Sequence, residues 1–211
     1  MNKEKKTNEI LGGVLGALLF GALFVFLLIS DMDILLNRTQ DLNQLDQNNQ
    51  VEKDQYVSVD VNAVLANYAW TKHTVNFIPV GKDQHYIVWL DSGAVISLTV
   101  KNKKMIEKLS DIYAQTWAYI NAGDSNPNLG LSESLKVKGK IHTMDSEIQG
   151  YYDKVLEEAG ITDADLKIYR VTIDTTETFG RSLGYLIFFF AMFVIFVLMI
   201  VSGIRKKKQM I

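Results

Sequence analysis

Cysteine is absent from the 211-residue sequence. Its absence excludes disulfide bonds, thiolate metal sites and cysteine nucleophiles, so any folded domain in this chain is held together by packing alone. Such a composition fits an exported bacterial domain better than a small secreted eukaryotic domain, which usually depends on disulfides.

Motifs of the common enzyme and cofactor classes are also missing. The sequence contains no GxSxG, P-loop, GxGxxG or HExxH pattern, and its three histidines, His73, His85 and His142, are far apart without metal-ligand spacing. The sequence therefore predicts no catalytic residue, no cofactor and no metal site, and we interpret the protein as non-enzymatic. The tryptophans Trp70, Trp89 and Trp117 either line a ligand groove or are buried in the core.

One short motif provides an enzymatic alternative. Residues 89–94, Trp-Leu-Asp-Ser-Gly-Ala, resemble the Asp-Ser/Thr-Gly-Ala motif of aspartic proteases, whose catalytic aspartate shares a proton with a second aspartate. Asp174-Thr175-Thr176 is a second candidate, but it lacks the glycine. Because Asp-x-Gly between two strands is typical of a hairpin turn, we interpret residues 91–93 as a turn and keep a membrane aspartic protease using Asp91 as a remote alternative.

Charged residues are missing from two long apolar segments, residues 10–30 and residues 182–204. At ~1.5 Å of rise per residue, a helix of either length covers the ~30 Å hydrocarbon core of a bilayer. The first segment is followed by no small-x-small cleavage site, so we predict an uncleaved anchor and not a signal peptide. The sequence thus predicts two transmembrane helices in contact with the lipid bilayer, without the polar residues that a transport path in one subunit needs.

Lysine and arginine are concentrated at the two ends of the chain. Residues 1–9 and 205–211 together carry seven basic and two acidic residues, whereas the middle carries fifteen basic and twenty-two acidic residues. Because cytoplasmic flanks of membrane spans are enriched in Lys and Arg, we predict a cell-membrane protein with both termini cytoplasmic and an extracytoplasmic central domain. The net negative charge of that domain argues against a nucleic-acid partner, since duplex affinity depends largely on neutralising phosphates.

Small residues recur along one side of the first apolar segment. Gly13, Ala17 and Gly21 follow each other at intervals of four residues, and Gly12 and Gly16 form a GxxxG pattern beside them. Small residues on a helix face let another backbone approach closely within the membrane. These five residues are candidates for packing against a partner helix or in a homo-oligomer, and the alternative is packing against the phenylalanine-rich second segment of the same chain.

The middle of the chain predicts an α+β domain with an antiparallel or mixed sheet covered by two amphipathic helices. Alternating or β-rich runs predict the strands, and the first four strands are expected to form a meander. Apolar residues at helical spacing predict the two helices. Asn102 is the expected cap of the first helix, and Ser146 and Gln149 are spaced as a capping box for the second. The predicted strands are 56–61, 68–78, 86–90, 94–100, 135–141 and 166–173, and the predicted helices are 102–123 and 145–159, with Gly160 as stop and a loop around Pro127.

These features divide the chain into seven parts. The divisions are a cytoplasmic N-terminus 1–9, a first transmembrane helix 10–30, a polar stalk or linker 31–55, the α+β domain 56–174, a connector 175–181, a second transmembrane helix 182–204 and a basic cytoplasmic tail 205–211. The stalk is either helical or flexible, and its thin stripe of leucines is not expected to join the core.

The layout and three short segments resemble a family of uncharacterised two-span membrane proteins of low-GC Gram-positive bacteria. The segments are Tyr86–Leu90, Gly139–Ile141 and Val171–Glu177. The resemblance implies a location in the cell membrane and no particular activity. We therefore expect a membrane-tethered extracytoplasmic interaction module, an accessory subunit or scaffold of a membrane complex, with a protein partner or a second copy bound. The alternative is a ligand-sensing domain that signals through a partner.

Overall fold

The computed structural model describes residues 3–75, 78–122, 134–176 and 178–208. The chain forms two compact units, one made of Met1–Arg38 with Thr178–Ile211 and the other of Thr39–Glu177. The expected helix end at Gly123 and the expected loop around Pro127 lie outside the described residues, as do the last three residues of the basic tail.

The first unit contains two long apolar helices, α1 (Lys3–Ser30) and α6 (Phe179–Lys208), and the short helix α2 (Met32–Leu35). Both long helices are long and apolar enough to cross a membrane. Helix α6 begins at Phe179, so the expected connector 175–181 is shorter than predicted. The backbone N–H groups of Arg181 and Ser182 both donate to the Thr178 carbonyl and form the first turn.

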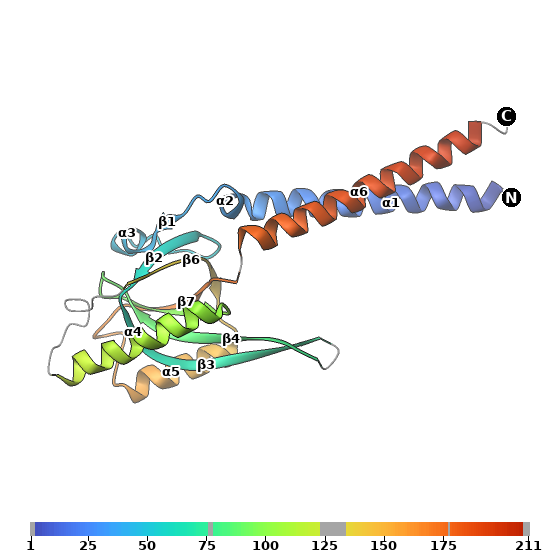
Figure 1. Cartoon of the computed structure of the whole chain (residues 1–211). Helices are drawn as coiled ribbons and strands as arrows, with labels where there is room; N and C mark the ends of the chain where they lie inside the picture. Colours follow the sequence, from blue (N-terminus) through green and yellow to red (C-terminus); the bar gives the residue numbers. More distant parts are fainter. Residues whose placement is uncertain (1–2, 76–77, 123–133, 177, 209–211) are drawn as a thin grey trace. The chain divides into compact units, whose positions relative to one another are not determined.

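The second unit is built around a seven-stranded mixed sheet in the order β1-β2-β6-β7-β5-β4-β3. The pairs β1–β2 and β5–β7 are parallel, and the other four pairs are antiparallel. The strands are β1 (Gln40–Asp41), β2 (Tyr56–Val61), β3 (Ala63–Val75), β4 (Ile78–Trp89), β5 (Val95–Val100), β6 (Leu135–Thr143) and β7 (Ile168–Asp174), and the helices are α3 (Leu42–Gln47), α4 (Lys103–Asn121) and α5 (Ser146–Glu158). The predicted α+β class with a mixed sheet is confirmed (Figure 1).

Strand β2 has the predicted bounds but not the predicted neighbours. It does not join the meander of β3, β4 and β5, and it pairs with β1 on one side and with β6 on the other. Only Asn62 lies between β2 and β3, whereas a hairpin needs at least two loop residues. The chain therefore turns a corner at Asn62, and β3 leaves β2 to form the opposite edge of the sheet.

The segment 31–55 differs from the predicted stalk, because part of it belongs to the folded domain. Asp41 caps α3 by accepting from the backbone N–H of Asn43 at 2.9 Å, as expected for an aspartate at this position. Leu42 is fully buried and Leu45 nearly so, both within the main core of the domain. The last two leucines of the stripe thus form the buried face of a short helix, whereas Leu36 is exposed.

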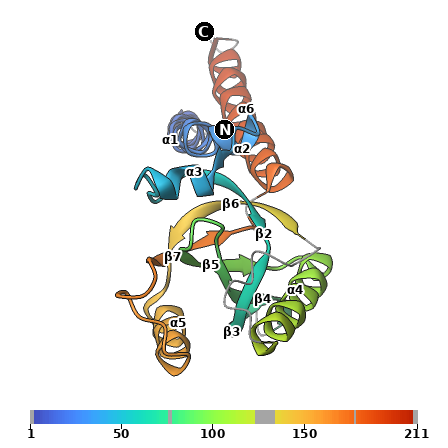
Figure 2. The ribbon, with the colours of Figure 1, turned by 90° about the vertical axis from the view of Figure 1, so that its left-hand side faces the viewer.

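The two amphipathic helices pack on opposite faces of the sheet, and Figure 2 shows them on either side of it. Leu109 and Ile112 of α4 join the main core, whereas Tyr152 and Leu156 of α5 join a second cluster. Neighbouring residues of the strands alternate between these clusters because successive side chains point to opposite faces. The prediction that two helices cover the sheet is confirmed.

The ends of α4 and α5 can be compared with the caps predicted from the sequence. Asn102 caps α4 by accepting from the backbone N–H of Lys104 at 2.9 Å, as predicted. The predicted capping box of α5 is wrong, since Asp145 occupies the cap position and Ser146 is already helical. Gly160 ends α5 with a φ of 69°, a conformation that glycine adopts without steric cost.

Candidate functional site

A half-open groove of about 490 Å³ lies between β3 and α5, a volume within the range of ligand sites. Five consecutive residues of β3, residues 68–72, form one wall, and Glu147, Ile148 and Tyr151 of α5 form the other. We call this feature the β3–α5 groove. It lies along an edge of the sheet, because β3 has β4 as its only strand neighbour in the described sheet.

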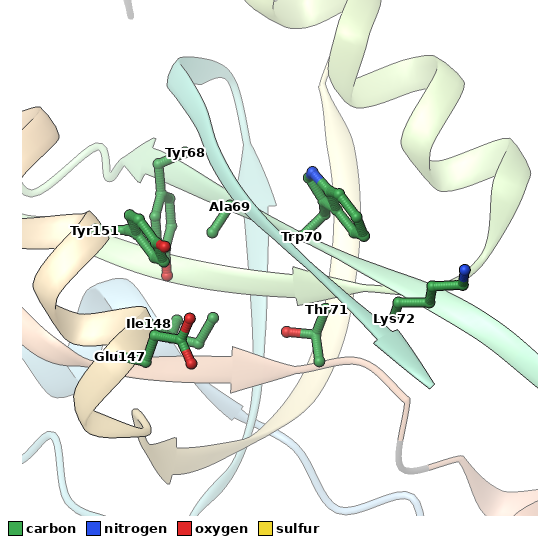
Figure 3. A pocket seen from close by; sticks show the side chains of 8 residues that line it. All are labelled: Tyr68, Ala69, Trp70, Thr71, Lys72, Glu147, Ile148 and Tyr151. Carbon is green, nitrogen blue, oxygen red and sulfur yellow. The ribbon is translucent and has the colours of Figure 1, made fainter. Parts of the chain in front are cut away.

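Figure 3 shows how the side chains of the β3–α5 groove are directed. Tyr68 of β3 and Tyr151 of α5 both line the groove on the side where Glu147 lies in this view, and the Thr71 hydroxyl points toward the Glu147 carboxylate from the opposite wall. The side chain of Lys72 extends away from α5. The groove therefore presents aromatic rings, hydroxyl groups and one carboxylate.

The position of Tyr68 depends on an irregularity in β3. The pairing of β3 with β4 shifts register between Asn67 and Ala69, so that Tyr68 lies at a bulge. A bulge re-aims a side chain that strict alternation would send to the other face. Tyr68 thus reaches the α5 side of the sheet, where its ring packs edge-to-face on Tyr152 with centroids 5.4 Å apart.

Behind the groove, a chain of hydroxyl groups crosses the sheet from β3 to β7. The Tyr68 hydroxyl lies 2.7 Å from Ser97 Oγ of β5, and Ser97 Oγ donates to Thr172 Oγ1 of β7 at 3.1 Å. Thr172 Oγ1 lies 2.8 Å from Thr99 Oγ1. Because Ser97, Thr99 and Thr172 are all buried, these hydrogen bonds satisfy groups that would be costly to leave unpaired.

The same network returns to the groove through a buried histidine. Thr99 Oγ1 lies 3.0 Å from His85 Nδ1, and His85 Nε2 lies 2.9 Å from Thr71 Oγ1. Tyr68 and Thr71, both in the groove wall, are therefore the two ends of one network that runs through β4, β5 and β7. This bonding fixes the orientation of both hydroxyl groups before any ligand arrives.

Burial keeps the side chains of Tyr68 and Tyr152 neutral over the physiological range. Burial raises the pKa of Tyr68 to about 12, although the hydrogen bond with Ser97 acts in the opposite direction. Burial also raises the pKa of Tyr152, and the nearby Tyr68 adds to the effect. Neither hydroxyl is therefore available as a base near neutral pH.

The small residues singled out in the first apolar helix do not all face the same surroundings. A Cβ added at Gly13 would lie 2.9 Å from Ile200 Cγ1 of α6, one at Gly21 would lie 3.2 Å from Phe193 Cδ2, and one at Gly16 would overlap the ring of Phe196. Ala17 is half-buried.

Gly12 lies on the outer side of α1. It is exposed, and an added Cβ would meet nothing within 4 Å. The structure thus brings Gly13, Gly16 and Gly21 against α6 of the same chain and leaves Gly12 on a free surface of the helix pair. Phe20 adds a stacked contact to Phe196, with ring centroids 5.4 Å apart.

Asp91 lies in the turn between β4 and β5. Gly93 has a φ of 90° and its N–H donates to the Leu90 carbonyl, so residues 91–93 form the predicted hairpin turn. Asp91 is exposed and accepts from Asn62 Nδ2 at 3.0 Å. Asp174 pairs with Thr99, at the far end of β5 from this turn. The two aspartates of one chain are therefore not arranged as a proton-sharing dyad.

Sequence reasoning found part of the β3–α5 groove. Trp70, one of the three tryptophans considered for a ligand groove, contributes to its β3 wall and is 58% exposed, with Lys82 Nζ 4.3 Å from the centre of its ring. The contributions of Tyr68, Glu147 and Tyr151 were missed, because their convergence depends on the bulge in β3 and on the position of α5. In the part of the chain that the structure describes, no group of three metal-ligating side chains occurs.

The fold and the site define a class of protein: an α+β domain with a groove at its sheet edge, connected at both ends to long apolar helices. The chain belongs to the family described as Domain of unknown function (DUF8577), which matches residues 3–206. No curated protein and no solved structure matches the chain.

Proposed function

We propose that this protein is a two-span membrane protein whose extracytoplasmic domain binds an extended segment of a partner protein along β3. It acts as an interaction module, an accessory subunit or scaffold of a membrane complex, and not as an enzyme. The observation that carries the proposal is that β3 is both the edge strand of the sheet and one wall of the β3–α5 groove.

Among the described residues, two side chains of α4 bond to the backbone of the first part of β3. The Val64 N–H donates to Thr116 Oγ1 at 3.1 Å, and Trp117 Nε1 donates to the Leu65 carbonyl at 2.9 Å, so two side chains of α4 occupy the backbone there. The groove begins three residues further along, at Tyr68. A sheet edge beside a groove is the arrangement used for strand addition, in which backbone hydrogen bonds supply affinity and the groove accepts side chains.

The membrane topology in this proposal is supported by the two long apolar helices and by the charges at the ends of the chain. Lys and Arg outnumber acidic residues before the apolar part of α1 and after the apolar part of α6. The positive-inside rule then assigns both termini to the cytoplasm and the unit Thr39–Glu177 to the other side.

The absence of cysteine makes the topology easy to test. Asn8 and Ser110 are both exposed, the first in α1 and the second in α4. In intact cells, a membrane-impermeant thiol reagent should label Ser110→Cys and should label Asn8→Cys only after permeabilisation. Labelling of Asn8→Cys alone in intact cells would contradict the proposed orientation.

Partner binding is tested by position-specific crosslinking in native membranes. A photo-reactive amino acid at Lys72, on the β3 wall, should give a discrete adduct, whereas the same group at exposed Glu158, at the far end of α5, should not. An adduct of twice the mass of the chain identifies a second copy as the partner. Equal adducts at both positions, or none at Lys72, would count against binding along β3.

A further inference from the structure

We infer that the β3–α5 groove accepts a basic side chain of the bound segment and holds its cationic end against Glu147. This inference rests on the proposed function, because it names the side chain that an added strand would insert between β3 and α5. It follows from the charge, the aromatic rings and the apolar surface that the groove combines.

The electrostatic character of the groove is set by one carboxylate. One acidic and one basic residue line it, Glu147 and Lys72. The Lys72 side chain extends away from α5, whereas the Glu147 carboxylate lies at the groove (Figure 3). A ligand group within the groove therefore meets a negative charge. Such a site favours a cation, because an opposite charge a few ångströms away stabilises the charged form of the ligand.

The aromatic rings of the groove favour the same ligand. Tyr68 and Tyr151 line the same groove as Glu147, and Tyr151 is 48% exposed, so its ring is accessible. The negative face of an aromatic ring attracts ammonium and guanidinium groups. The Thr71 hydroxyl, fixed by its hydrogen bond with His85 Nε2, adds a polar group on the opposite wall.

The remaining lining explains why the ligand is a long side chain and not a bare cation. Ala69 and Ile148 contribute apolar surface from β3 and α5, respectively. Lysine and arginine have an apolar stem and a charged end, and the stem gains by lying on such surface while the end reaches polar groups. Such a side chain can therefore use both the apolar and the charged surface of the groove.

The test uses the full-length protein in nanodiscs of phosphatidylcholine, with ¹³C-labelled isoleucine methyl groups. The probe is N-acetyl-lysine N-methylamide, and N-acetyl-norleucine N-methylamide is its neutral counterpart of similar length. We expect the lysine probe to shift the Ile148 methyl resonance saturably, with the weak affinity usual for a single side chain, on the order of millimolar. The norleucine probe should bind at least about tenfold more weakly, because it lacks the charge.

Two variants separate Glu147 from the general charge of the domain. Glu147→Gln should weaken the lysine probe about tenfold, whereas Glu157→Gln, at another exposed position of the same helix, should leave it unchanged. Equal binding of lysine and norleucine, or an unchanged affinity in Glu147→Gln with an intact amide spectrum, overturns the inference. The inference is also overturned if glycerophosphoethanolamine displaces the lysine probe and binds more tightly than that probe does, since the cation in the groove would then be a lipid headgroup.

The outcome is distinguishable from that of the proposed function. If the Lys72 crosslink forms but the lysine probe does not bind, strand addition stands and the basic specificity fails. If the lysine probe binds but the crosslinks at Lys72 and Glu158 do not differ, the groove recognises cations and the proposal of partner binding along β3 fails.

Discussion

The ammonium nitrogen of Lys167 lies 2.7 Å from a carboxylate oxygen of Asp46, which is 5% exposed. The Tyr169 hydroxyl donates to the same carboxylate at 2.6 Å. Asp46 belongs to α3, near the start of the folded domain, and Lys167 and Tyr169 belong to the region of β7, near its end. This cluster therefore joins the two ends of the domain that lead to the apolar helices.

Acid should weaken this cluster. Burial alone would raise the pKa of Asp46, but the hydrogen bonds from Lys167 and Tyr169 and the charge of Lys167 together hold that pKa below its usual value of 3.8. A carboxylate with a lowered pKa stabilises the folded state above the unfolded pKa, and this contribution is lost as the pH falls through the folded pKa. We expect the free energy of unfolding to decrease below about pH 4.

Asp46→Asn tests the origin of this pH dependence. The variant should lose about 1–3 kcal/mol at pH 7 and should show a flatter stability profile between pH 5 and pH 2, as measured by chemical unfolding followed by tryptophan fluorescence. Asp60→Asn, at an exposed position of β2, should behave like the unchanged protein. An Asp46→Asn profile that still parallels that of the unchanged protein would assign the acid sensitivity to other groups.

Two glycine substitutions should have opposite effects. A Cβ at Gly139 of β6 would lie 2.6 Å from the backbone oxygen of Asp174 in β7, and backbone cannot move aside cheaply. Gly139→Ala should therefore destabilise the domain by about 1–3 kcal/mol. Gly150 of α5 is exposed with nothing within 4 Å of an added Cβ, so Gly150→Ala should stabilise it by about 0.5–1 kcal/mol. Thermal unfolding of both variants provides the comparison.

The helix pair offers a matched comparison on neighbouring turns of α1. Gly16→Leu should disrupt packing against Phe196, and the pair should dissociate at a lower concentration of denaturing detergent. Gly12→Leu places the same side chain on the outer surface and should leave this resistance unchanged. A variant at Gly12 that instead abolishes an oligomer seen with the unchanged protein would show that the outer surface binds another helix.

The buried network should behave as a unit. His85→Ala and Thr99→Val each break the 3.0 Å interaction between His85 Nδ1 and Thr99 Oγ1, so the second substitution should cost less in the presence of the first. We expect a coupling of about 1 kcal/mol in a double-mutant cycle of unfolding free energies. Additive losses would mean that the two side chains stabilise the domain independently.

Asp91 should be dispensable. Because Asp91 is exposed in a turn and accepts a hydrogen bond from the side chain of Asn62, Asp91→Asn should change the unfolding free energy by less than about 0.5 kcal/mol. It should also leave Lys72 crosslinking unchanged. Loss of a proteolytic activity in this variant, measured on membranes that contain the unchanged protein as a positive control, would revive the aspartic protease alternative.

Local signals predicted the elements better than their assembly. The alternation of residues 56–61 gave the bounds of β2, and Asn102 identified the start of α4, because both signals act within a few residues. The pairing of β2 with β6 joins segments about 80 residues apart in sequence, and it depends on how the core closes. The sequence analysis also missed the burial of Leu42 and Leu45. Four leucines among many polar residues are too sparse a pattern to predict a helix that packs in the core.

The candidate site was harder to predict than the fold. Its β3 wall requires a bulge that brings Tyr68 to the same face as Thr71, and no residue type specifies that shift. Its other wall requires α5 to lie beside β3, although the two are separated by more than 70 residues. Only Trp70 was a candidate from composition, because exposed or groove-lining aromatics are a general signal.

The two attachments of the domain differ in how they would bear mechanical load. On the N-terminal side the chain enters through β1, two residues at the sheet edge that pair with β2 alone, whereas it leaves through β7, seven residues between β6 and β5. A pull through the N-terminal attachment would separate β1 from one neighbouring strand and then strain the Asp46–Lys167 contact, while a pull through the C-terminal attachment must separate β7 from two neighbouring strands. We therefore expect the N-terminal attachment of the domain to yield first, so that tension applied through α1 loosens α3 before it affects the β3–α5 groove.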